Sequence, residues 1–230
     1  RKLFLILYKR NDIEHKDIFL NAKEILLFEE NYIQLKNTIN SEKILNQRFV
    51  KELLQDDLFL LMIQKSLVMD IFFEKMLTKI RHEILLALEE NNLIFLQKNI
   101  KFIFSLAHQC FLNEYCFFKS NEEIDWINKL IISIENKKEV NEIEIAILGC
   151  YIPLINSKLI TNKLLKYKSN NLLFNNLVNM HILEPLKEDS LVNSIKSFET
   201  ISDSISEKVR EQYEENPFPR WRYTYNKTQS

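Results

Sequence analysis

The sequence predicts an all-α fold of about nine to eleven helices, arranged as a multi-helix layered or solenoid-like domain. Apolar residues recur at spacings of three and four through nearly every segment, which is the period of an amphipathic helix. The chain also contains a single glycine, Gly149, and only four prolines. Because turn-rich β architectures depend on glycine and proline for their backbone angles, these two counts disfavour an all-β fold.

The composition of the chain indicates a globular protein and disfavours nucleic-acid-binding and membrane-spanning classes. The chain has 230 residues, of which 46% are apolar and 27% are charged, and this is the composition of a soluble globular domain. The formal net charge is −1, with acidic and basic residues interleaved, so no field over the whole domain attracts nucleic acid. The longest uncharged apolar runs, such as 58–63, are too short to span a membrane.

The cysteine and glycine content indicates which thiol chemistry and which cofactor sites the chain can contain. The three cysteines, Cys110, Cys116 and Cys150, lie in apolar helical contexts, which predicts buried reduced thiols in a cytoplasmic protein. Loops that cradle phosphate need several glycines, and this chain has one. It therefore has no dinucleotide fingerprint, no P-loop and no Gly-rich loop of a Rossmann-like methyltransferase, and we expect no cofactor site within it.

The helices in the first part of the chain are predicted from caps and stripes. Asp70 can cap a long helix in which Ile71, Met76, Ile80 and other apolar residues form one stripe. Asn91-Asn92 then interrupts this helix. A second long helix is predicted from about 93 to 118, because apolar residues continue along one side of it.

The later helices are predicted from capping boxes and prolines. Ser120-Asn-Glu-Glu123 has the form of a capping box and opens a third helix, and another helix starts near Asn141. Pro153 should limit or kink that helix, and Pro185 should end the helix that contains Met180.

The last helix has a similar signal. The sequence Ser204-Ile-Ser-Glu207 repeats the form of the capping box, so a terminal helix carrying Tyr213 is predicted after it. No repeat of thirty to forty residues holds along the chain, and the consensus positions of tetratricopeptide repeats are missing.

No catalytic or metal site is predicted. Arg81-His82-Glu83 begins like the helix of a zinc protease, but Leu86 stands where the second histidine is needed. His82 is therefore expected to be a surface histidine. His108, Cys110 and Cys116 lack the spacing of zinc ligands. The paired carboxylates fall mostly at helix ends, where the helix dipole or solvent accounts for them.

One polar segment interrupts an apolar helix. Gln109 and Asn113 are one helical turn apart, and Glu114 follows directly. The sequence predicts that Gln109 and Asn113, with Glu114, form a polar seam that hydrogen-bonds to a neighbouring helix. The expected role is structural, because buried amides must be satisfied.

The end of the chain has a different composition from the rest. Pro217 and Pro219 stop the terminal helix and force an extended path, because a residue before proline is pushed out of the α region. We expect the aromatic and arginine side chains of this ending to dock on a neighbouring domain or its ligand; a plain helix stop that folds back onto its own core is the alternative. The residues expected to dock or bind are Tyr213, Glu214, Glu215, Asn216, Pro217, Phe218, Pro219, Arg220 and Trp221.

Three stretches resemble a bacterial protein family. In this family, tetratricopeptide repeats and a helical region precede a class I S-adenosylmethionine-dependent methyltransferase domain. The stretches are Ser105-Leu-Ala-His-Gln-Cys-Phe-Leu-Asn-Glu-Tyr115, Ile147-Leu-Gly-Cys-Tyr-Ile-Pro-Leu154 and Val209-Arg-Glu-Gln-Tyr-Glu-Glu-Asn-Pro-Phe-Pro-Arg-Trp221. The last motif is the most specific, and in the family it precedes the first strand and the Gly-rich loop of the methyltransferase.

The resemblance implies a domain organisation. It implies a helical accessory domain over 1–208 and a connector over 209–230 that leads toward a methyltransferase domain absent from this sequence. The family's cofactor-binding residues therefore have no counterpart here, and S-adenosylmethionine would belong to a full-length protein. The recognisable tetratricopeptide repeats of the family are also missing upstream.

Three functions follow as expectations. The first is a non-catalytic helical accessory region that presents a protein or glycan substrate to a methyltransferase domain in cis, or packs against that domain. The second is a stand-alone helical scaffold that binds a protein partner. The third is an enzyme with an unfamiliar site, and whether the chain is itself an enzyme stays open.

Overall fold

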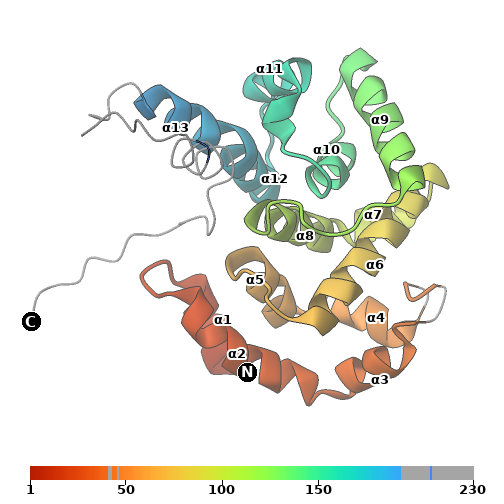
Figure 1. Cartoon of the computed structure of the whole chain (residues 1–230), viewed down its shortest axis with the longest axis vertical. Coiled ribbons are helices and arrows are strands. Elements are labelled where there is room, and N and C mark those ends of the chain that lie inside the picture. Colours follow the sequence, from red (N-terminus) through yellow and green to blue (C-terminus); the bar gives the residue numbers. More distant parts are fainter. Residues whose placement is uncertain (41–42, 46, 193–207, 209–230) are drawn as a thin grey trace, which may run out of the picture.

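The computed structural model describes residues 1–40, 43–45, 47–192 and 208, and every regular element among them is helical (Figure 1). The predicted all-α class is therefore confirmed. The first elements are α1 (Lys2–Lys9), α2 (His15–Leu27), α3 (Glu30–Thr38), α4 (Arg48–Leu53), α5 (Asp57–Lys65), α6 (Ile71–Glu89) and α7 (Leu93–Lys98). The later α-helices are α8 (Ile100–Leu112), α9 (Asn121–Asn136), α10 (Glu142–Gly149), α11 (Lys158–Lys166), α12 (Leu172–Val178) and α13 (Glu184–Val192). A 3-10 turn spans Leu154–Asn156, and a π-helical turn spans Asn179–Leu183.

Helix α8 lies at the centre of the fold. It packs against α5 on one side and against α10 on the other, so the helices form successive layers (Figure 1). Helices α1 and α2 cover α5, and α9 covers α10. Every side chain of α8 from Phe102 to Leu112 is buried. This burial explains why α8 is mostly apolar around its whole circumference, with Ser105, His108 and Gln109 as buried polar residues, whereas a surface helix keeps a polar face.

The helix starts predicted at Asp70, Ser120 and Asn141 are confirmed, because local caps determine them. The Asp70 carboxylate accepts hydrogen bonds from the backbone N–H groups of Phe72 and Phe73, at 3.0 and 3.1 Å, and starts α6. The predicted capping box at Ser120 starts α9, and Asn141 caps α10. Each cap satisfies N–H groups that have no partner within the helix.

The helix predicted from 93 to 118 is wrong in two places. It breaks at Asn99, which ends α7 and begins α8, and it ends at Leu112 rather than near Phe118. The end is a Schellman motif, in which Tyr115 N–H donates to the Cys110 carbonyl at 2.9 Å. Glu114 and Tyr115 have positive φ angles, 53° and 58°. Asn113 and Glu114 therefore follow the helix instead of lying inside it.

The prediction that Pro185 ends a helix is also wrong. The chain continues from α12 through the π-helical turn into α13, and Pro185 is the second residue of α13. Proline is tolerated in the first turn of a helix, where its missing N–H removes no hydrogen bond. The wider π turn directly before Pro185 separates it from the regular backbone hydrogen bonds of α12.

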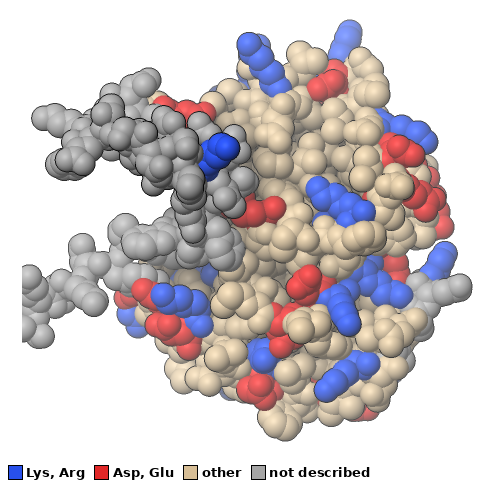
Figure 2. Space-filling view, viewed as in Figure 1, with Lys and Arg blue, Asp and Glu red and all other residues tan. Residues whose placement is uncertain are grey.

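The number of helical segments exceeds the predicted number. Thirteen α-helical segments occur among the described residues, partly because Asn99 and the π turn divide helices that the apolar period joins. No helix in the described part of the chain is both long and apolar enough to cross a membrane. Basic and acidic side chains are interspersed over the face drawn in Figure 2. The helix predicted after Ser204 and the connector over 209–230 lie outside the described residues, apart from 208.

Candidate functional site

A buried arginine, Arg81, lies in the middle of α6. Its side chain is fully enclosed, and its guanidinium group donates a hydrogen bond to the Phe118 carbonyl. The guanidinium carbon lies 4.2 Å from the centre of the Tyr151 ring, within the range of a cation–π contact. Its terminal nitrogen is 3.9 Å from the Glu123 carboxylate. Because an isolated buried charge is very costly, this carboxylate is the group that makes the position of Arg81 tolerable.

Glu123 is shared by several partners. It is 3% exposed, and one carboxylate oxygen accepts a hydrogen bond from the Tyr151 hydroxyl at 2.7 Å. The other oxygen accepts from Ser120 N–H at 2.8 Å, which is half of the capping box of α9. The first oxygen also lies 3.5 Å from His82 Nδ1. Glu123 therefore connects α6, α9 and the segment after α10.

Burial shifts the pKa of two groups in and beside this network, Tyr151 and Lys119. Burial raises the pKa of Tyr151 above its ordinary range; the charge of Arg81 opposes this shift, and the charge of Glu123 adds to it. The Tyr151 hydroxyl therefore stays protonated and donates a hydrogen bond to the Glu123 carboxylate. Burial, together with the nearby Arg81, lowers the pKa of Lys119, whose ammonium group donates to the Tyr151 carbonyl at 2.9 Å.

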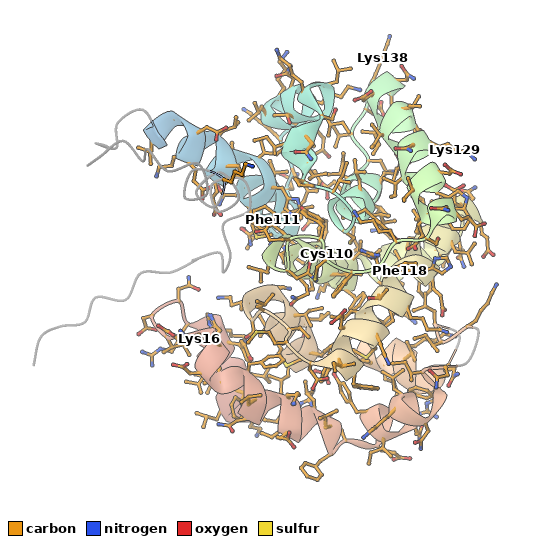
Figure 3. The ribbon with its side chains drawn as sticks, in the orientation of Figure 1. Lys16, Cys110, Phe111, Phe118, Lys129 and Lys138 are labelled. Carbon is orange, nitrogen blue, oxygen red and sulfur yellow. The ribbon has the colours of Figure 1, made fainter. Side chains whose placement is uncertain are left out.

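A groove runs along α6 beside this network, and we call it the α6 groove. Its volume is about 400 Å³, and it lies between α6 and the segment 118–123. One wall comes from three successive turns of α6. Phe118, which Figure 3 labels, also lines the groove, and 75% of its surface is exposed. The lining residues are Glu74, Lys75, Thr78, Lys79, His82, Glu83, Phe118, Ser120 and Glu123.

His82 connects the buried network to the groove. Its side chain is 38% exposed, and its ring lies 6.1 Å from the ring of Trp126. Because Nδ1 faces the buried Glu123 carboxylate, the other ring nitrogen, Nε2, is directed away from that carboxylate. His82 is thus a partly exposed histidine, as the sequence predicts, and it lines a groove.

A second and larger hollow lies between α7 and the connection from α9 to α10, and we call it the α7–α10 cleft. Its volume is about 1370 Å³. Leu93 and Ile94, at the start of α7, are 50% and 86% exposed beside it. The apolar lining residues are Leu93, Ile94, Ile100, Val140 and Ile143, and the charged ones are Lys98, Lys137, Lys138, Glu139 and Glu142.

Some of the charges in this cleft are already engaged. Lys137 donates to the Glu144 carboxylate at 2.6 and 2.8 Å. Glu142 accepts from the Ser169 hydroxyl and, at 3.1 Å, from the Asn171 amide. Among the described residues, Lys98 and Lys138 are exposed and form no ion pair (Figure 3 labels Lys138).

The structure separates the three residues of the predicted polar seam. Gln109 is fully buried and reaches the connection between α5 and α6. The Asn113 side chain accepts from Tyr115 N–H at 3.0 Å, within its own turn. The Asn113 amide nitrogen is buried without a hydrogen-bond partner in the described part of the chain. Glu114 is partly exposed and has a left-handed backbone. Gln109 thus bonds to the connection between α5 and α6, whereas Asn113 bonds within its own turn.

The residues of the predicted docking motif lie outside the described part of the chain. They are Tyr213, Glu214, Glu215, Asn216, Pro217, Phe218, Pro219, Arg220 and Trp221. The docking role of this motif therefore stays a prediction.

The buried network was not predicted from the sequence, although one signal was present. Arg81 is four residues after Leu77 and four before Leu85, so it falls on the buried face of α6. A charge on an apolar stripe indicates either a buried pair or a functional group. Its partners Glu123 and Tyr151 are far away in sequence, and no local pattern connects them.

The prediction of buried thiols needs one correction. Cys110 and Cys150 are buried, but Cys116 is exposed, because the chain has already left α8 at that point. All three are free thiols. Burial and the charge of Glu74 raise the pKa of Cys116, so the thiol form dominates at neutral pH.

We therefore predict selective but slow alkylation. Iodoacetamide should modify the native protein at one position, Cys116, and the rate should rise with pH, because the thiolate is the nucleophile. Replacing Glu74 by Gln removes a negative charge near the thiol and should raise the rate at pH 7. Mass spectrometry of digested samples measures this rate, with Glu89→Gln as a control at the far end of α6. Equally fast modification of Cys110 would contradict the burial described above.

Comparison with known proteins gives no relative for this chain. No protein family, no curated protein and no solved structure matches it. The described residues contain no group of three or more His, Cys, Asp or Glu side chains placed to hold a metal ion. The α6 groove and the α7–α10 cleft are the two places described above where a ligand can be accommodated.

Proposed function

We propose that this chain is a non-catalytic helical module that binds a polypeptide partner in the α7–α10 cleft. The observation that carries the proposal is the size and lining of the cleft. Pockets for small molecules have volumes of about 300–1,000 Å³. The cleft measures about 1370 Å³ and exposes Leu93 and Ile94, so it suits a segment of polypeptide better than a small ligand.

The chemistry of the lining favours an acidic amphipathic helix as the partner. An apolar stripe of such a helix would cover Leu93, Ile94 and Ile143, as in other complexes where a helix lies in a groove. Among the described residues, Lys98 and Lys138 flank this surface and form no ion pair, and Glu142 is occupied by donors from 169–171. Glu139 is then one exposed carboxylate against these two lysines. Carboxylates on the partner would form ion pairs with these two lysines. Charge complementarity of this kind fixes the orientation of the bound partner and disfavours partners of the wrong charge.

The module fits two biological settings. In one, it is an accessory region that presents a substrate to, or packs against, an S-adenosylmethionine-dependent methyltransferase domain in cis, as the resemblance of its sequence implies. In the other, it is a stand-alone scaffold. The exposed apolar residues of the cleft support partner binding in both settings, so binding to the cleft is tested first.

The test uses a designed probe. A fluorescent acidic amphipathic peptide of about 15 residues, with Leu on one face and Glu on the other, is titrated with the full chain and followed by anisotropy. A matched peptide with Lys in place of Glu is the charge control. We expect the acidic probe to bind more tightly, and Ile94→Glu to weaken its binding by at least about tenfold.

A matched variant makes the result specific. Ile132 is also an exposed isoleucine, at 60%, but it does not line the cleft, so Ile132→Glu should leave binding unchanged. Equal binding of the acidic and basic probes would overturn the charge argument. Binding that survives Ile94→Glu would overturn the cleft as the docking site.

A further prediction concerns the cofactor. The single glycine, Gly149, is buried at the end of α10, where a Cβ atom on it would lie 3.3 Å from the His181 ring. Gly149 therefore serves close packing within the core and forms no phosphate-binding loop. We therefore expect calorimetric titration of this chain with millimolar S-adenosylmethionine to show no saturable heat. Saturable one-to-one binding would place a cofactor site in this chain and contradict the accessory role.

A further inference from the structure

Helices α1 and α2 form an antiparallel pair at one edge of the fold (Figure 1). Arg1, at the start of α1, pairs with Glu29, just beyond the end of α2, and the Tyr8 ring stacks on the His15 ring with their centres 5.5 Å apart. Both helices pack against α5, so their exposed residues lie on the side away from α5. We call this side the α1–α2 face, and its exposed residues are Lys2, Leu3, Ile6, Lys9, Asp17, Leu20 and Glu24.

Apolar side chains form the middle of the α1–α2 face. Leu3 and Ile6 on α1 are 62% and 61% exposed, and Leu20 on α2 is 61% exposed. Phe28, directly after α2, continues the side of that helix that carries Leu20 and is 80% exposed. In layered helical folds, a terminal layer that faces water keeps a polar outer side. These large apolar side chains therefore indicate a surface that another protein covers.

The charged residues of the α1–α2 face are separated by sign. Lys2 and Lys9 lie two helical turns apart on α1, on either side of its apolar residues. Asp17 and Glu24 lie at the same spacing on α2, on either side of its exposed leucine. Among the described residues, Lys2, Lys9 and Asp17 form no ion pair, and Glu24 has a distant contact with Lys23 at 3.9 Å. The α1 half is therefore basic, the α2 half is acidic, and the two charges balance.

This charge pattern favours a second copy of the chain over other partners. A two-fold rotation brings α1 of one copy to α2 of the other, so the lysines of each copy meet the carboxylates of its partner. An anionic membrane, or a partner with one sign of charge, would be attracted by one helix and repelled by the other. Neighbouring ions add no bias, because Arg10 pairs with Asp12 and Lys16 pairs with Glu14.

We infer that the α1–α2 face joins two copies of this chain into a two-fold symmetric dimer. Leu3, Ile6 and Leu20 of both copies form its apolar centre, and α1 of each copy lies against α2 of the other. The two helices have 8 and 13 residues, so they are about 12 and 20 Å long. An interface of this size is small for a dimer, and we expect a dissociation constant of about 10–100 μM. The surface is separate from the α7–α10 cleft, and the dimer does not depend on the peptide-binding function.

Sedimentation velocity of the full chain tests the dimer. Between about 5 and 300 μM, the original chain should shift from monomer to dimer. Ile6→Glu places a charge in the apolar centre and should leave the chain monomeric over this range. The control is Ile132→Glu, which changes an isoleucine of matching exposure, 60%, on α9 and should dimerise like the original chain. An original chain that stays monomeric, or a dimer that survives Ile6→Glu, would overturn the inference.

Two charge-reversed variants test which helices meet. Lys2→Glu with Lys9→Glu makes both halves of the face acidic, and Asp17→Lys with Glu24→Lys makes both halves basic. Each variant alone should be monomeric, whereas an equimolar mixture should recover the dimer, because each α1 then meets the opposite charge on α2 of the other variant. All four residues are exposed, so circular dichroism should show that both variants are folded. A mixture that stays monomeric would overturn the pairing of α1 with α2.

Discussion

Glu123→Ala is expected to destabilise the protein by about 3–5 kcal/mol, because it leaves a buried arginine without its carboxylate. Arg81 has no exposed surface, and its guanidinium cannot turn to solvent when Glu123 is removed. The Tyr151 hydroxyl and Ser120 N–H lose an acceptor at the same time. Urea unfolding followed by circular dichroism measures the loss as a lower midpoint at an unchanged m-value.

The neighbouring residue Glu122 provides the control. It lies in the same first turn of α9 but is exposed, so Glu122→Ala should change stability by no more than about 1 kcal/mol. Glu123→Gln keeps the shape and one acceptor oxygen but removes the charge. If the main role of Glu123 is to compensate the charge of Arg81, Arg81→Met should lower the free energy of unfolding less in the Glu123→Gln variant than in the unmodified protein. A loss for Glu123→Ala no larger than that for Glu122→Ala would contradict the buried pair.

Helix starts were predictable from sequence because their causes are local. Asp70, Ser120 and Asn141 each accept hydrogen bonds from N–H groups two or three residues later. Such caps need no information from the rest of the chain. The same holds for the end of α6, where Asn91 takes a positive φ of 55°, which asparagine adopts more readily than most residues.

The end of α8 was not predictable in this way. Glu114 and Tyr115 are not residue types that favour positive φ angles, yet both adopt them. Tertiary contacts accompany this conformation, since the Tyr115 hydroxyl lies 3.3 Å from His181 Nδ1 in the π-helical turn. A contact between residues 66 positions apart leaves no periodic signal in the sequence.

The candidate sites could not be predicted from the sequence for the same reason, because residues far apart in the chain form them. Two of the residues beside the Glu123 carboxylate, Arg81 and Tyr151, come from α6 and from the segment after α10, far from Glu123 in the sequence. The α6 groove requires Phe118 to lie opposite α6, whereas the apolar period placed it inside a helix that in fact ends earlier. The candidate sites therefore depend on packing between helices, whereas the all-α fold class follows from the apolar period of each helix alone.

Gln109→Met is expected to cost about 3 kcal/mol, because it leaves three buried backbone groups without a partner. Gln109 is fully buried on α8, and its amide nitrogen donates to the carbonyls of Ile63 and Ser66 at 2.9 and 2.8 Å. Its amide oxygen accepts from Val68 N–H at 3.2 Å, in the orientation that pairs each donor with an acceptor. Methionine has a similar length, so the loss reports on hydrogen bonding rather than on a cavity.

Two comparisons make this result specific to the connection between α5 and α6. Gln97→Met changes an exposed glutamine and should shift stability by no more than about 0.5 kcal/mol. Asn113→Leu should cost less than Gln109→Met, because Tyr115 N–H also bonds to Cys110 and the Asn113 amide nitrogen is already unpaired among the described residues. Hydrogen exchange should show faster exchange at Val68 in the Gln109→Met variant. Equal losses for Gln109→Met and Asn113→Leu would indicate that the two amides act as one unit, as the predicted polar seam requires.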